Sequence, residues 1–139
     1  MDHKTTGSPK ESSELDTATI AGGLFGLLVG DALGVPYEFH PADRIPSFEQ
    51  IEMTPPSGFR RAHVGVAPGT WSDDGAHALI LLDSLLVNHG LDLSHLGTNL
   101  CRWLHEGLFA VNRNVFDVGA QTSSAINALV RGVPAHSSG

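Results

Sequence analysis

Three oxygen-bearing side chains follow one another at Ser72, Asp73 and Asp74, just before a leucine-rich segment. Two interpretations fit this pattern. Ser and Asp at a helix amino terminus accept hydrogen bonds from its unpaired amides and suit the positive end of the helix dipole. Adjacent carboxylates with a hydroxyl also match the oxygen ligands that Mg²⁺ or Mn²⁺ prefers. Taken alone, the pattern favours the helix cap.

Two further acidic residues lie within and just after an apolar, glycine-rich segment. Asp31 falls near the carboxyl end of that segment, where burial and the helix dipole both disfavour a negative charge. We therefore expect Asp31 to bind backbone amides or to cap the next segment. Glu38 follows in a Pro-Tyr-Glu-Phe loop, where a solvated side chain is the simplest expectation. An acidic neighbour would instead favour a cation beside Glu38.

The histidines and serines match no familiar catalytic pattern. The eight histidines lack the His-Glu-x-x-His spacing of zinc enzymes, so we expect them on the surface or at helix flanks. Ser47 and Ser84 lack the Gly-x-Ser-x-Gly turn of the serine hydrolases, and no phosphate-binding Gly-Lys-Ser/Thr loop occurs. Serine hydrolase and P-loop chemistry are therefore disfavoured.

Four helices and one long loop are expected to position these residues. Apolar spacing, capping residues and Gly or Pro stops predict helices from residue 16 or 17 to 35, from about 74 to 89, from 92 or 94 to about 104, and from 119 to 130. Residues 40–68 carry five prolines, which predicts a long irregular connection. Loops of this length are usually functional or mobile. Strand signals are almost absent, so the predicted fold is an all-α helical bundle.

A stripe of glycines marks the first expected helix. Gly22, Gly26, Gly30 and Gly34 recur every four residues, although each interior glycine costs a helix about 1 kcal/mol relative to alanine. We expect another helix backbone to pack closely against this stripe, rather than a ligand.

Composition limits the class of protein. The 139 residues are 41% hydrophobic and 17% charged, which fits one globular domain. A net charge of −7 disfavours nucleic acid and anionic lipid as partners. Cys101 is the sole cysteine, which excludes an intramolecular disulfide and indicates a cytoplasmic location. Residues 1–16 read as a disordered polar tail, and the apolar residues 20–35 are too few to span a membrane.

Two motifs, in their order along the chain, resemble those of the ADP-ribosylglycohydrolase family. This family includes the dinitrogenase-reductase-activating glycohydrolases. The motifs are residues 26–38, Gly-Leu-Leu-Val-Gly-Asp-Ala-Leu-Gly-Val-Pro-Tyr-Glu, and residues 68–74, Pro-Gly-Thr-Trp-Ser-Asp-Asp. Phe116-Asp117-Val118-Gly119 is similar to the family's Asp-Ile-Gly segment, so the resemblance runs from about Ile20 to the end of the chain. It implies the amino-terminal part of an all-helical fold with a binuclear Mg²⁺ or Mn²⁺ centre that binds the ribose of ADP-ribose.

The resemblance also implies roles for particular residues. The metal ligands carried over by motif position are Glu38, Ser72, Asp73 and Asp74, with Ser72 where the family more often has Thr. Asp117 matches an aspartate near the substrate ribose, and Glu38 or Asp117 would transfer protons while water attacks the anomeric carbon. The implied substrate is an ADP-ribosylated protein or a small ADP-ribose conjugate.

One departure from the family is large. Its second Asp-x-Asp-Thr ligand set and its Gly-Asn-Gly phosphate loop do not occur in the sequence. We therefore expect residues 17–139 to be a partial domain, truncated at its carboxyl end, inactive alone and partnered by the missing half. The alternative is a noncatalytic helical fragment, or an interaction module that binds metal or ADP-ribose.

Overall fold

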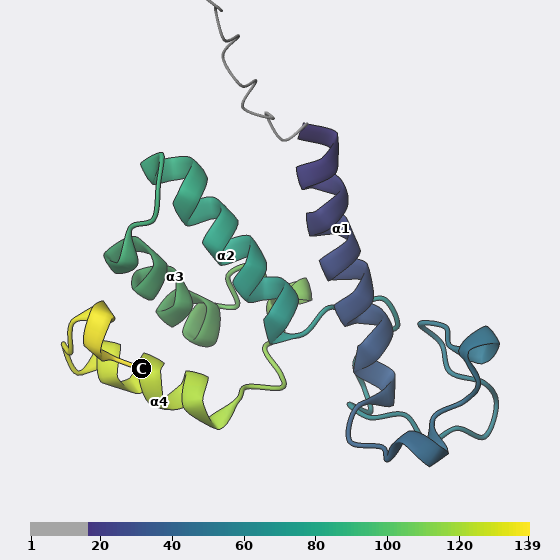
Figure 1. Cartoon of the computed structure of the whole chain (residues 1–139). Coiled ribbons are helices and arrows are strands. Elements are labelled where there is room, and N and C mark those ends of the chain that lie inside the picture. The colour runs from purple at the N-terminus through teal and green to yellow at the C-terminus, as the bar shows by residue number, and fades with distance from the viewer. Residues whose placement is uncertain (1–16) are drawn as a thin grey trace, which may run out of the picture.

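The computed structural model describes residues 17–139, so the tail expected at residues 1–16 lies outside the described residues. Four α-helices follow in order: α1 (Thr17–Gly34), α2 (Asp73–Asn88), α3 (Leu93–Glu106) and α4 (Ala120–Val130). Short 3₁₀ turns interrupt the connections, and residues 17–139 contain no strand (Figure 1). The expected all-α fold is confirmed, and each helix starts and ends close to its predicted bounds.

Helices α2, α3 and α4 enclose the hydrophobic core. Ala76 and Ile80 of α2, Trp103 of α3 and Ile126 of α4 are buried together at its centre. Trp103, with only 1% of its surface exposed, is the largest of these side chains. The core therefore fixes the position of α2, whose first residues carry the Ser-Asp-Asp motif.

Local signals explain the ends of α3. Asp92 precedes the helix, and its Oδ1 accepts hydrogen bonds from the amides of Ser94 (2.8 Å) and His95 (3.0 Å). Gly107 ends the helix at φ 72°, and an added Cβ there would lie 2.6 Å from the Arg113 backbone. Any larger residue would clash with that backbone and strain this turn.

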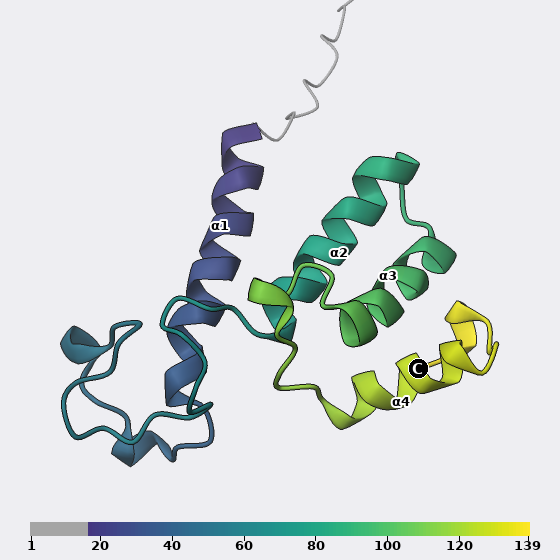
Figure 2. The ribbon, with the colours of Figure 1, turned by 180° about the vertical axis from the view of Figure 1, so that it is seen from behind.

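Helix α1 stands beside α2, apart from the other helices (Figures 1 and 2). It ends where Pro36 enters a 3₁₀ turn, Val35–Tyr37. The long loop then returns to this end of α1: the Ala62 amide donates to the Pro36 carbonyl (2.9 Å), and the Tyr37 hydroxyl donates to the Glu52 carbonyl (2.8 Å). The irregular connection that the prolines predict is present and is tied to α1.

The helix that we expect against the glycine stripe is not among the described residues. A Cβ built at Gly22, Gly26, Gly30 or Gly34 would meet no neighbouring atom within 4 Å. Of the residues in α1, Ala32 alone is buried, and Phe25 keeps 65% of its surface exposed. Within residues 17–139, α1 therefore has no helix close to its glycine face.

The length of this apolar segment also differs from expectation. The segment Thr17–Tyr37 is 21 residues long and has a mean hydropathy of 1.7. By length and composition it is apolar enough to cross a membrane. The core helix of a soluble protein meets the same criterion, so length and composition do not decide between the two. Asp31, near the end of this segment, is held by polar contacts to the start of α2.

Alanine at Gly26 should stabilise the chain. The added methyl group meets nothing, and the helix loses a flexible residue, so we expect the free energy of unfolding in urea to rise by about 0.5–1 kcal/mol. Gly75→Ala is the matched control and should destabilise, because its Cβ would lie 2.8 Å from Trp71 and 2.9 Å from Asp31. A Gly26→Ala chain less stable than the parent would show that the stripe is covered.

Candidate metal and substrate site

The carboxylate of Asp31 joins α1 to the amino terminus of α2. Its Oδ2 accepts hydrogen bonds from the amides of Ser72 (2.9 Å) and Gly75 (2.7 Å), and its Oδ1 accepts one from the Ser72 hydroxyl (2.8 Å). This confirms that Asp31 binds backbone amides and caps the next segment. It also explains the glycine at position 75, where a side chain would meet Asp31 and Trp71.

Ser72 does not cap α2 with its own side chain, so that part of the helix-cap interpretation is wrong. The Ser72 hydroxyl donates to Asp31 instead, and the residue is only 6% exposed. With its proton engaged, the hydroxyl oxygen keeps its lone pairs for another partner. Asp31 thus orients one of the predicted metal ligands.

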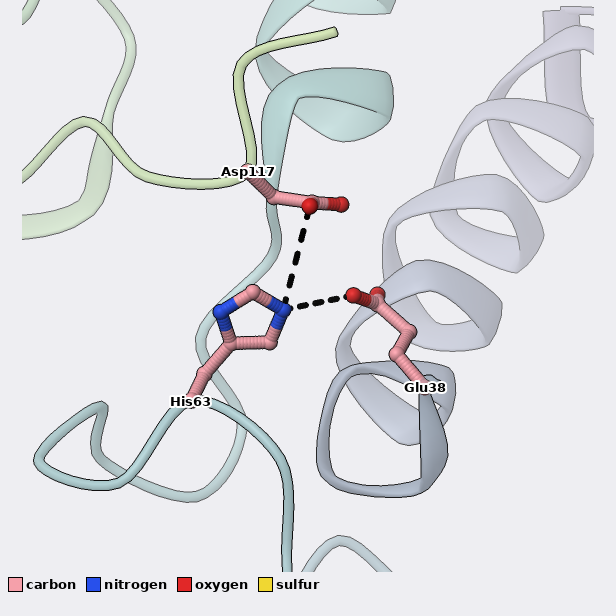
Figure 3. Close-up of side chains that lie close together, drawn as sticks. All are labelled: Glu38, His63 and Asp117. Atoms are coloured by element: carbon pink, nitrogen blue, oxygen red, sulfur yellow. Dashed lines mark hydrogen bonds and ion pairs between the residues drawn. The ribbon is translucent and has the colours of Figure 1, made fainter. Parts of the chain in front are cut away.

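A second cluster forms where three loop segments meet: Glu38 after α1, His63 in the long loop and Asp117 before α4 (Figure 3). His63 Nε2 lies 2.6 Å from Glu38 Oε2 and 3.9 Å from Asp117 Oδ1. All three residues are partly buried. The structure therefore brings together both predicted catalytic carboxylates, Glu38 and Asp117, around one imidazole.

His63 is the residue that the sequence did not reveal. We expected the histidines on the surface or at helix flanks, yet the His63 side chain is only 14% exposed and lies in a loop. Its ring contacts those of Phe39 (5.4 Å between centroids) and Phe116 (5.0 Å). No spacing motif links these residues, because the loop brings them together only in the folded chain.

The negative charges near Glu38 interact with those at the start of α2. Burial raises the pKa of Asp73, and the negative charges of Asp117 and Asp74 raise it further, although His77 opposes them. Burial also raises the pKa of Glu38, where His63 opposes the shift and Asp117 adds to it. Asp117 is therefore close enough to act on both Glu38 and Asp73, and it links the two parts of the site.

The donor set fits a cation. Ligand atoms of Glu38, His63 and Asp117 lie within 4.8 Å of one another, near enough to hold one metal ion. Within residues 17–139, no Lys or Arg forms a salt bridge with either carboxylate of this group. Partly desolvated carboxylates without such a partner are stabilised by a metal ion. The ligand set Glu38, Ser72, Asp73 and Asp74 remains a prediction, and the structure places His63 beside Glu38.

Comparison with known proteins identifies the class. A family model described as ADP-ribosylglycohydrolase matches residues 12–139, and the chain belongs to this family. Its members are metal-dependent, in agreement with the donor set described above. No solved structure matches the chain.

Individual relatives are identical to this chain at about a third of the aligned positions. The chain is 34% identical over 121 residues to ADP-ribosylarginine hydrolase Tri1 of Serratia proteamaculans, covering 87% of this chain and 30% of the relative. It is 35% identical over 111 residues to the Tri1 protein of Pseudomonas putida, covering 79% and 28%. An uncharacterized protein of Escherichia coli, YegU, is 32% identical over 123 residues, covering 86% and 36%. The chain spans about a third of the length of these relatives.

Removing the Asp31 carboxylate should destabilise the chain. In Asp31→Ala, the two amides and the Ser72 hydroxyl lose their acceptor in a buried place, so we expect a loss of about 2–3 kcal/mol in the free energy of unfolding in urea. The exposed Asp43 supplies the control, because Asp43→Ala should change little. Equal stability of the two variants would contradict the cap.

The stability of the metal-free chain should depend on the charge of Asp73. Because its pKa is raised above the ordinary 3.8, the folded state binds the proton more strongly, and stability falls as pH rises from below 3.8 through the raised pKa. Asp73→Asn should therefore melt higher than the parent at pH 7, with a gap that closes below pH 3.8. Thermal melts without metal across this range measure it. A lower melting temperature at pH 7 would indicate that the Asp73 carboxylate caps α2.

Proposed function

We propose that the chain forms part of a hydrolase that cleaves the glycosidic bond of ADP-ribosylated protein side chains or related ADP-ribose conjugates at a binuclear metal centre. Membership of the ADP-ribosylglycohydrolase family supports the class of reaction. Two relatives are named ADP-ribosylarginine hydrolase, which favours arginine as the modified side chain.

The position of Asp117 is the observation that carries this proposal. It lies beside His63 and Glu38, and its charge also acts on Asp73 at the start of α2. Carboxylates from three separate segments therefore converge on one region, although they repel one another there. Such an arrangement destabilises a metal-free chain and is retained where the negative charge serves binding or catalysis.

Each residue has a distinct part in the proposed reaction. Glu38, Asp73 and Asp74 present carboxylate oxygens, and Ser72 presents the lone pairs of a hydroxyl that Asp31 orients. When bound, Mg²⁺ or Mn²⁺ supplies positive charge that orients the ribose and polarises its hydroxyl groups. The Glu38 carboxylate, whose pKa burial raises, can accept a proton from the attacking water and return it to the leaving group.

The ligands available from the described residues limit what the chain does alone. Two hard cations take about six oxygen ligands each, and the predicted set supplies four side chains. We therefore propose that the 139-residue chain binds metal weakly and turns over little substrate. The alternative, a noncatalytic module that binds metal or ADP-ribose, is supported by the same shortage of ligands.

Calorimetry with Mn²⁺ and a hydrolysis assay on ADP-ribosyl-arginine test the proposal together. We expect measurable Mn²⁺ binding by the parent chain, at least tenfold weaker binding by Asp73→Asn, and hydrolysis close to background. ADP-ribosyl-serine serves as the comparison substrate, and Asp43→Asn serves as the control variant. Absence of Mn²⁺ binding would refute the metal centre. Robust hydrolysis that Asp74→Ala abolishes would show instead that these residues suffice for catalysis.

A further inference from the structure

We propose that His63 is a positioning residue that holds the Glu38 carboxylate for cation binding by a hydrogen bond from its Nε2. This inference rests on the function proposed above. It assigns a role to a residue of the long loop that neither family motif contains.

The charge of a cation-binding carboxylate defines which atom donates. His63 Nε2 lies 2.6 Å from Glu38 Oε2. A carboxylate that binds a cation is ionised and has acceptors only, so we place the hydrogen on Nε2, which donates it. The same nitrogen is 3.9 Å from Asp117 Oδ1, beyond hydrogen-bonding distance but within attractive range of a second negative charge. One N–H group thus lies between two carboxylates that would otherwise repel each other.

The imidazole is itself held in place. The rings of Phe39 and Phe116 lie 5.4 and 5.0 Å from the His63 ring, both tilted against it, and the His63 side chain is 14% exposed. The backbone of His63 has φ 46°, a left-handed conformation that non-glycine residues adopt at a cost. Figure 3 shows the ring reaching from its loop toward Glu38 and Asp117. The surrounding structure therefore fixes the ring before any ligand arrives.

A fixed imidazole restricts the Glu38 side chain. Glu38 Oε2 is engaged by His63, and the Asp117 side chain also acts on this carboxyl group. The long, flexible glutamate can then present Oε1 to a cation in one orientation, without the loss of rotamer freedom on binding. Partners that orient metal ligands in this way typically change metal affinity 10- to 100-fold when they are removed.

Two substitutions separate the hydrogen bond from the packing of the ring. His63→Phe keeps an aromatic ring between Phe39 and Phe116 but removes the donor, whereas His63→Gln loses the ring and keeps an N–H group. By calorimetry on the 139-residue chain, we expect Mn²⁺ to bind His63→Phe roughly 10- to 100-fold more weakly and His63→Gln within about threefold of the parent. His105→Phe, at an exposed position of α3, is the control. Thermal melts verify that each variant folds.

Nitrogen-15 spectra of the histidine rings test the same bond without metal. We expect His63 to be protonated at Nε2 in the parent and to lose this preference in Glu38→Ala, with the signals assigned by their loss in His63→Phe. A His63 spectrum that Glu38→Ala leaves unchanged would overturn the proposal. The proposal would also be overturned if His63→Phe bound Mn²⁺ at least as tightly as the parent. The same holds if His63→Gln bound Mn²⁺ as weakly as His63→Phe. If the parent binds no Mn²⁺, the proposed function fails, while the spectra still decide whether His63 holds Glu38.

Discussion

The partly buried carboxylate of Asp31 makes the interaction on which the rest of the arrangement depends. It accepts three hydrogen bonds from the first turn of α2 and thereby fixes α1 against the Ser-Asp-Asp motif. Glu38 follows α1 after one short turn, so the same contact sets the distance between Glu38 and the start of α2. A negative charge near the carboxyl end of one helix is unfavourable, but here it faces the positive amino terminus of another.

Sequence patterns predicted the elements of this fold well, because their signals are local. Asp92 before α3 and Pro36 after α1 mark helix ends through the hydrogen bonds they make or cannot make. The role of Asp31 was also predictable, since a carboxylate inside an apolar helix needs amide partners. Its partners, Ser72 and Gly75, lie 41 and 44 residues away in the sequence. They were not predictable, because no local pattern encodes a contact of that separation.

The candidate site was predicted in part, and the missing part has a physical reason. Motifs carried Glu38, Ser72, Asp73, Asp74 and Asp117, whose assignment to metal and substrate stays a prediction. His63 escaped because it lies in an irregular loop whose path depends on contacts such as that of Ala62 with Pro36. The partner of the glycine stripe stays a prediction for a different reason: small residues permit close packing, but they do not specify which segment supplies the partner.

The separation of the paired residues along the chain affects the order in which the chain folds. Connections of four and thirteen residues join α2 to α3 and α3 to α4, so their core forms at a modest entropic cost of loop closure. Attaching α1 through Asp31 and Ser72 closes a loop of 41 residues, which costs more entropy. Within the described residues this attachment leaves most apolar side chains of α1 exposed, Phe25 among them. A surface that covered them would protect them from aggregation.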